Sequence, residues 1–246
     1  MAIVLINIGN THTTWASGEP GSIRVINRHP TARITRDGWQ APTLPAMRSD
    51  VEVMGASVVP KATERIWRGV NLPMRWLDAP LAEYVGLDLS VIDKTTIGAD
   101  RLANAIAAIH ELPLPALVVD CGTAFASVLV DERKRVLGGF ILPGRKLQRM
   151  ALKRHTGQLP VVPMSDAPPM PYGINTPGCI RAGIDLGVPG AVAALITAVR
   201  DQLGAASLTT IAIGGDRDYL VQRIPDLTAG PDDFTLRGIA YAATMI

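Results

Sequence analysis

Two short segments of the chain place hydroxyl and amide side chains around a glycine, at the point where an apolar strand ends. The first is "LINIGNTHTTWAS" and the second is "VVDCGTA". Backbone N–H groups in such turns, together with nearby amide and hydroxyl side chains, can donate hydrogen bonds to phosphate oxygens. We therefore predict two phosphate-binding turns, formed by Gly9, Asn10 and Thr11 and by Gly122 and Thr123.

A carboxylate stands at the strand end of the second turn, and the first turn lacks one. Asp120 could hold a cation or a metal-bound water beside the phosphates. The matching position in the first turn is Asn7, whose carboxamide has no charge. Each turn alone is also explained as an ordinary turn, because Asn and Gly favour hairpins and a strand-end Asp can cap a turn. The repeated frame favours a function for both.

A third candidate is the segment "GADR" at the start of a predicted helix, which contains Asp100 and Arg101. A carboxylate there can accept the proton of an attacking hydroxyl, as phosphoryl transfer requires. The neighbouring Arg can hold an anionic group of a substrate. On spacing alone, an acidic first turn with a surface Arg is the simpler interpretation.

Apolar periodicity predicts the elements that must position these residues. The chain should alternate strands and helices, with a return strand after each Gly turn. A helix over 145–156 should have a solvated basic face, and two helices should cover 179–204. The closing segment "DFTLRGIAYAATMI" should be a strand followed by a helix. The other expected elements are strands at 2–8, 12–17 and 51–60, a helix at 98–112, and a strand, turn and strand at 115–131.

The two Gly turns indicate an internal duplication. The break "LPLP" at 112–115 divides the chain into an N-terminal half, 1–112, and a C-terminal half, 113–246. Two similar α/β halves, each with one turn, predict a nucleotide cleft between them. Neither the P-loop pattern nor the Rossmann G-x-G-x-x-G pattern occurs at either turn.

Composition narrows the class of protein. The chain has 246 residues, of which 48% are apolar and 19% charged, so we expect a folded globular protein. A net charge of +2 gives no support for nucleic-acid binding. We find no run that predicts a membrane span and no secretory leader. Cys121 and Cys179 lack metal-ligand spacing, and reduced thiols in the cytoplasm are expected.

Together these segments resemble the type III pantothenate kinases of the acetate and sugar kinase/Hsp70/actin superfamily. The resemblance covers nearly the whole chain in the right order. It implies a homodimer of duplicated ribonuclease-H-like halves. It also implies ATP-dependent phosphorylation of pantothenate, the first step of coenzyme A synthesis, with Mg²⁺ and a monovalent cation such as K⁺ or NH₄⁺. The matching segments are "IGNT", "GADRLANAIAA", "VVDCGTA", "LGGFILPG", "HTGQLPVV", "NTPGCIRAG" and "IGGD".

The resemblance implies a role for each matching residue. Asp100 resembles the base that takes the proton of the pantothenate hydroxyl, and Asp120 resembles the carboxylate near the metal or cation. Arg101 resembles the residue that faces the pantothenate carboxylate. The remaining matches are Gly98 and Thr176 as substrate contacts, and Asn7, Gly9, Asn10, Thr11, Gly122 and Thr123 as ATP and phosphate contacts.

This sequence departs from the family pattern at three places. Asn7 replaces the Asp of the first motif, Val91 and Lys94 stand near the usual Tyr and Pro of the substrate segment, and Phe125 and Ala126 replace two Thr. We expect a kinase whose rate is reduced by the missing carboxylate, by about a hundredfold for a loss of roughly 3 kcal/mol. Two alternatives remain open: a weak or inactive nucleotide-binding relative with an accessory role, and a kinase for another small hydroxylated substrate.

Overall fold

A computed structural model describes residues 3–36, 51–70, 72–204 and 207–246, and its residues form two compact units. The first unit comprises Met1–Leu114, Val128–Gly138 and Asp233–Ile246, and the second comprises Pro115–Ser127 and Gly139–Asp232. The C-terminal segment therefore packs with the N-terminal part of the chain. The division after residue 112 stays a prediction about the duplicated chain.

The first sheet contains the first Gly turn. Its strand order is β3-β2-β1-β4-β5. β1 and β2 are antiparallel and β4 runs parallel to β1, so Asn7 lies between Thr14 and Ala56. The strands are β1 (Ile3–Ile8), β2 (His12–Glu19), β3 (Ser22–Pro30), β4 (Glu52–Ser57) and β5 (Met74–Trp76).

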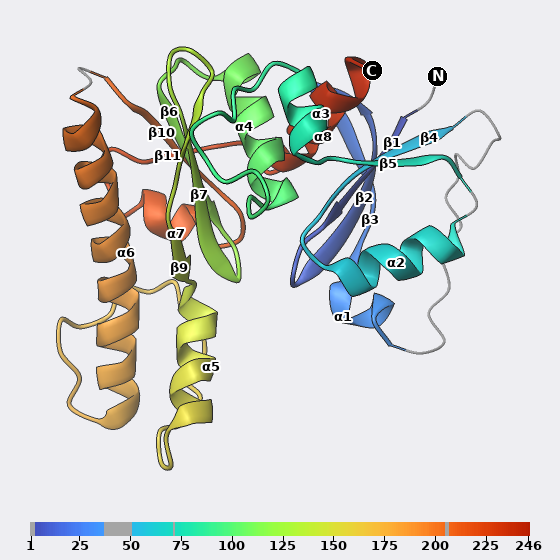
Figure 1. Cartoon of the computed structure of the whole chain (residues 1–246). Helices are drawn as coiled ribbons and strands as arrows, with labels where there is room; N and C mark the ends of the chain where they lie inside the picture. The colour runs from blue at the N-terminus through green and yellow to red at the C-terminus, as the bar shows by residue number, and fades with distance from the viewer. Residues whose placement is uncertain (1–2, 37–50, 71, 205–206) are drawn as a thin grey trace. The chain divides into compact units, whose positions relative to one another are not determined.

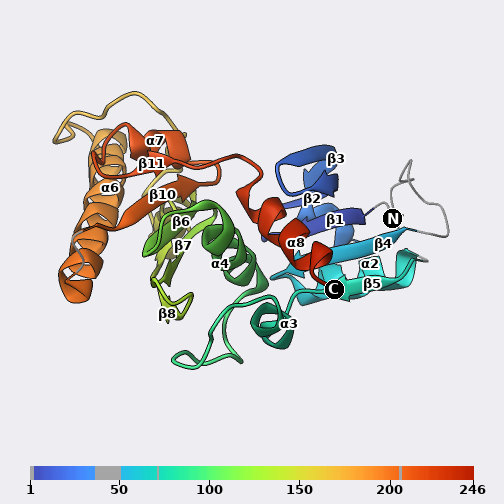
Figure 2. The same cartoon turned by 90° about the horizontal axis from the view of Figure 1, so that it is seen from above.

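Helices cover both faces of this sheet. Ile6 and Ile8 of β1 share a core cluster with Ile34 of α1 and Ile66 of α2. Because side chains alternate along a strand, Asn7 belongs to the opposite face, where α8 contacts β1. Figures 1 and 2 show α4 and α8 packed side by side. The helices are α1 (Thr31–Ile34), α2 (Pro60–Gly69), α3 (Ala79–Tyr84), α4 (Ala99–Glu111) and α8 (Phe234–Thr244).

The second sheet repeats the order of the first. It runs β11-β10-β6-β7-β8, and β9 also pairs with β7. β6 is parallel to β10, as β1 is to β4, and β7 follows β6 after the second Gly turn. The expected duplicated α/β fold is confirmed. The strands are β6 (Ala116–Cys121), β7 (Ala124–Val130), β8 (Val136–Gly138), β9 (Ile141–Pro143), β10 (Thr209–Ile213) and β11 (Thr228–Ala229).

The second unit contains α5 (Arg145–His155), α6 (Thr176–Leu203) and α7 (Arg217–Val221), with α5 and α6 running side by side (Figure 1). The prediction of two helices over 179–204 was wrong, because α6 is continuous through Pro189. A proline removes the hydrogen bond to the carbonyl four residues earlier. Here that carbonyl, of Asp185, accepts a hydrogen bond from the Tyr219 hydroxyl at 2.9 Å.

Two further expectations need correction. The residues "DFTL", expected as a strand, are helical: Asp233 is the N-cap of α8, and the helix begins at Phe234. By length and composition α6 could cross a membrane, although no membrane span was predicted from the sequence. However, α6 carries the fully buried Asp185, which is ion-paired with two arginines of α5. This pairing is typical of a helix in the core of a folded unit.

Candidate active site

The first Gly turn is held in place by one threonine. β1 ends at Ile8, and the Gly9 N–H donates to the His12 carbonyl at 3.0 Å. The Thr31 hydroxyl donates to the Gly9 carbonyl at 2.7 Å, and the Thr31 N–H donates to the Thr11 carbonyl at 2.9 Å. Asn10 and Thr11 are exposed at the tip. A fixed backbone with exposed amide and hydroxyl groups suits an anionic ligand.

Asp100 lies at the same edge of the first sheet. A Cβ on Gly98 would lie 2.5 Å from Asp100 Oδ1 and 3.4 Å from Val58 Cγ1. Val58 in turn donates its backbone N–H to the carbonyl of Ile8, the last residue of β1, at 3.1 Å. These contacts bring the "GADR" segment to the carboxyl end of β1, and any side chain at Gly98 would collide with the carboxylate.

Burial changes the acidity of Asp100. Its removal from water raises the pKa of the carboxyl group, and the charge of Arg101 and a hydrogen bond from the Arg101 N–H, at 2.7 Å, oppose this rise. The Arg101 guanidinium donates to the Thr96 carbonyl at 3.2 Å. A carboxylate whose pKa is shifted toward neutrality is better matched to accept a proton than an exposed one.

The second Gly turn depends on a glycine from another segment. The Gly144 N–H donates to the Thr123 carbonyl at 3.0 Å. A Cβ on Gly144 would lie 2.6 Å from the carbonyl oxygens of both Gly122 and Thr123, and 3.2 Å from the ring of Phe125. Gly144 ends the "LGGFILPG" segment, and its lack of a side chain lets the two segments meet.

A third segment, "IGGD", lies next to the second Gly turn, against Asp120 and Cys121. Gly214 has a φ of +87°, and a Cβ on it would lie 2.5 Å from Asp120 Oδ1. The Asp216 N–H donates to the Cys121 carbonyl at 3.0 Å. Burial raises the pKa of the Cys121 thiol, with help from the charges of Asp120 and Asp216, so this thiol stays protonated and is no nucleophile.

A buried ionic cluster lies next to this turn, and it was not predicted from the sequence. Arg145 follows Gly144 directly and has no exposed surface. It contacts Asp185 at 3.0 Å and Asp216 at 3.2 Å, and its guanidinium stacks on Tyr219. Arg149 is also buried and donates to both oxygens of Asp185 at 2.7 Å. The predicted helix over 145–156 is confirmed, but a fully solvated basic face was wrong for these two residues.

Thr176 begins α6, where the Asn175 side chain caps the helix by accepting from the Gly178 N–H at 2.8 Å. Thr176 is exposed and lines a pocket of about 550 Å³ with Leu152 of α5 and Cys179 of α6. On the first unit, the predicted site residues thus form two groups that meet at the end of β1: the first Gly turn and the "GADR" segment. On the second unit they form two further groups, the Gly122 turn and Thr176.

The donor set for a metal ion is small. Among the described residues, no three His, Cys, Asp or Glu side chains gather as a metal site. Mg²⁺ in phosphoryl-transfer sites is commonly held by one or two carboxylates together with substrate phosphates. Asp120, next to the second turn, fits that requirement. Asn7 would supply an oxygen without charge.

The family model described as type III pantothenate kinase matches residues 3–198. A type III pantothenate kinase from Rubrobacter xylanophilus is 30% identical over 259 residues, covering 96% of this chain and 95% of that protein. One from Laribacter hongkongensis is 31% identical over 247 residues and covers 99% of each chain.

Two solved structures share the fold. A Campylobacter jejuni protein described as a Baf family transcriptional activator has a TM-score of 0.62 at 17% identity, covering 98% of this chain and 97% of that one. An inorganic polyphosphate/ATP-glucomannokinase from Arthrobacter sp. strain KM has a TM-score of 0.53 at 12% identity, covering 100% and 99%. At these identities the structures show a common fold alone.

Proposed function

The chain belongs to the type III pantothenate kinase family, which phosphorylates pantothenate with ATP in coenzyme A biosynthesis, and we propose that Asp100 is the base of this reaction. Asp100 would take the proton of the pantothenate hydroxyl. The hydroxyl oxygen then bonds to the γ-phosphorus of ATP, the bond to the bridging oxygen breaks, and ADP leaves. The raised pKa of Asp100 and its place at the end of β1 support this role.

Two substrate contacts would lie beside Asp100, at the end of β1. Arg101 would hold the pantothenate carboxylate, since an Arg can donate two parallel hydrogen bonds to it. Gly98 would leave room for the substrate beside Asp100. Thr176, exposed at the start of α6, would contribute a further hydroxyl. Val91 is exposed and Lys94 is ion-paired with Glu83, and these two departures favour the alternative of a kinase for another small hydroxylated substrate.

The two Gly turns would bind the phosphates of ATP. Gly9, Asn10 and Thr11 would act from the first unit, and Gly122 and Thr123 from the second. Asp120 would hold Mg²⁺, which when bound would offset the charge on the phosphate oxygens. The requirement for K⁺ or NH₄⁺ belongs to the same proposal. Its test is activity in K⁺, NH₄⁺ and Na⁺ salts at constant ionic strength.

Asn7 is proposed to make this enzyme slow. It lies near the end of β1, two residues before Gly9 of the turn that would bind phosphate, where the family pattern has Asp. A neutral oxygen stabilises a cation and its phosphates less than a carboxylate does. A weak nucleotide-binding relative is the alternative that this residue favours, and it predicts ATP binding without turnover.

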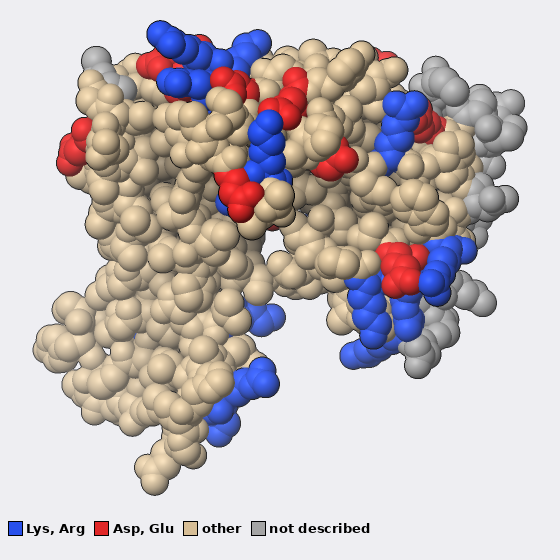
Figure 3. All heavy atoms as spheres, in the orientation of Figure 1, with Lys and Arg blue, Asp and Glu red and all other residues tan. Residues whose placement is uncertain are grey.

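A homodimer in the cytoplasm completes the proposal. The second unit exposes apolar side chains on β9, α5 and the segment before α6, and Ile174 is 92% exposed. Figure 3 shows few charged side chains over the lower part of this unit. Such a surface supports burial against a second copy. Sedimentation should give a dimer, and replacing Met150 and Ile174 with Glu should give a monomer.

The test of the function is a direct assay. The purified protein is incubated with ATP, Mg²⁺, NH₄⁺ and either pantothenate or a panel of other small hydroxylated acids and sugars. Phosphopantothenate formation above a blank supports the proposal. A different acceptor used more efficiently would reassign the substrate, and nucleotide binding without any product would support the accessory role.

A further inference from the structure

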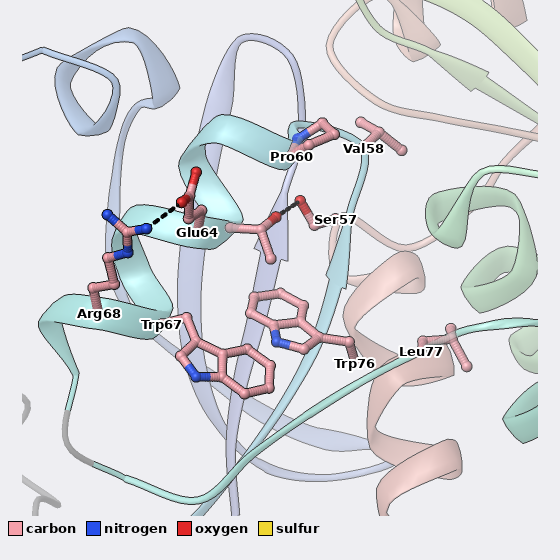
Figure 4. Close-up of a pocket in the computed structure, with 9 residues that line it drawn as sticks. Ser57, Val58, Pro60, Glu64, Trp67, Arg68, Trp76 and Leu77 are labelled. Carbon is pink, nitrogen blue, oxygen red and sulfur yellow. Dashed lines mark hydrogen bonds and ion pairs between the residues drawn. The ribbon is translucent and has the colours of Figure 1, made fainter.

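A separate pocket lies on the α2 face of the first unit. It has a volume of about 580 Å³ and is lined by the end of β4, the exposed side of α2 and the end of β5 (Figure 4). Val53, Gly55 and Ser57 lie on the same face of β4, and Val53 packs in the α2 core cluster, so Ser57 faces α2. Asp100 and Gly98 meet the other side of this strand end, at Val58. The proposed kinase site does not use this pocket.

Two tryptophans form its apolar walls. The Trp76 ring lies over Gly55, where any Cβ would come within 2.6 Å of it, so the sequence reserves space for this indole. Trp67, on α2, is 59% exposed. Figure 4 shows the two indoles next to each other at the mouth of the pocket. Aromatic side chains of this kind bind planar rings well.

One hydrogen-bond donor in this wall is unsatisfied. Trp76 Nε1 is shielded from solvent and has no hydrogen-bond partner among the described residues. An N–H left in this state costs free energy that an acceptor would recover. Figure 4 places this nitrogen on the side of the Trp76 ring that is turned toward Trp67. A planar ligand that moves the exposed Trp67 ring outward and lies between the two indoles would therefore meet the donor.

The remaining polar groups narrow the class of ligand. The hydroxyls of Ser57 and Thr63 are hydrogen-bonded to each other at 2.6 Å and line the inner wall. Arg68 is paired with Glu64 at 2.6 Å on the exposed rim. With a single Arg and a single carboxylate among the lining residues, neither a polyphosphate nor a metal ion is favoured.

We propose that this pocket binds a small planar aromatic molecule with hydrogen-bond acceptors at its edge. The ring would lie against Trp67 and Trp76, and an acceptor atom would pair with Trp76 Nε1–H. The volume is within the range of pockets for drug-sized ligands. The proposal goes beyond the kinase reaction and does not depend on it, since it concerns binding to the α2 face alone.

The test uses quinoline-2-carboxamide as the probe and the full chain labelled with 5-fluorotryptophan. The chain has four tryptophans, so ¹⁹F NMR gives four signals, of which those of Trp15, Trp67 and Trp76 are assigned with Trp15→Phe, Trp67→Leu and Trp76→Phe. The signals of Trp67 and Trp76 should shift saturably, with a Kd on the order of 0.1–1 mM. The signal of Trp15, which is buried in the core, should not move.

Matched variants and a matched compound decide the result. Trp67→Leu should weaken binding at least about tenfold, and Trp76→Phe about fivefold, because it keeps a ring and loses the donor. Tyr84→Leu, an exposed aromatic outside the pocket, should leave the Kd unchanged. Cyclohexanecarboxamide, which lacks the planar ring, should give no saturable shift. Absence of saturable shifts up to about 5 mM carboxamide, equal binding of cyclohexanecarboxamide, or an unchanged Kd in Trp67→Leu would overturn the proposal.

Discussion

Gly144 donates its backbone N–H to the carbonyl of Thr123 at 3.0 Å, and it approaches so closely that a Cβ would lie 2.6 Å from that oxygen. Real Cβ atoms do not approach a backbone oxygen so closely. We therefore expect Gly144→Ala to move the second Gly turn and to raise the KM for ATP at least about tenfold, since a displacement of 1 Å can cost a hundredfold in rate. Steady-state kinetics at varied ATP measure this effect.

Gly157→Ala is the control for this substitution, because a Cβ at Gly157 meets nothing within 4 Å. It should leave the KM for ATP unchanged. If Gly144→Ala folds and binds ATP normally, then the Gly122 turn does not hold the phosphates.

Asp100→Asn should abolish most of the turnover. An amide cannot accept the hydroxyl proton, and a general base contributes about 10²- to 10⁴-fold to the rate. The KM for pantothenate should change little. Measurement of kcat by ADP release gives the result, with the exposed Asp201→Asn as control. A kcat within twofold of the unsubstituted enzyme would remove Asp100 from the base role.

The pH dependence should follow the same carboxylate. Burial raises the pKa of Asp100 above the ordinary value of about 3.9. The value of kcat/KM for pantothenate should therefore rise with pH through this raised pKa and then level off. An acidic limb at the ordinary pKa of an exposed carboxylate would argue against Asp100 as the base.

Stability should show the opposite trend with pH. The folded state binds the Asp100 proton more tightly than the unfolded state, so ionisation of Asp100 lowers the free energy of unfolding. This loss develops as pH rises from the unfolded pKa through the folded one. Asp100→Asn removes it, so the Tm of this variant should exceed that of the unsubstituted enzyme at pH 7 and not at pH 4. Thermal unfolding at both pH values checks the sign.

The buried cluster around Arg145 should be essential to stability. Arg145→Met would leave Asp185 and Asp216 short of a partner, and breaking a buried ion pair costs about 3–5 kcal/mol. Arg68→Met, in an exposed pair with Glu64, should cost less than about 0.5 kcal/mol. Urea unfolding compares the two variants. Equal losses would mean that the Arg145 cluster contributes no more than a surface pair.

The sequence predicts the two Gly turns, the strands before and after them, and the helix of Asp100 because each depends on local patterns. Contacts between distant segments were not predictable in this way. The basic pattern of 145–156 resembles a solvated helix face, and the partner that buries Arg145, Asp185, is 40 residues away. In the sequence, Pro189 resembles a helix end because a proline removes a helix hydrogen bond. The Tyr219 hydroxyl that replaces this hydrogen bond comes from another helix, so the continuous helix was not predictable. Gly144 and Gly214 were visible as motifs, but their role as close contacts of the second turn depends on the fold.

The central claim is that this chain is a working pantothenate kinase whose rate is limited by Asn7. The most direct test compares kcat for phosphopantothenate formation in the unsubstituted enzyme and in Asn7→Asp, at saturating ATP, Mg²⁺ and NH₄⁺. We expect measurable turnover from the first and an increase of up to about a hundredfold in the second, from roughly 3 kcal/mol of added stabilisation. No product from either enzyme, or an equal or lower kcat in Asn7→Asp, would contradict the account.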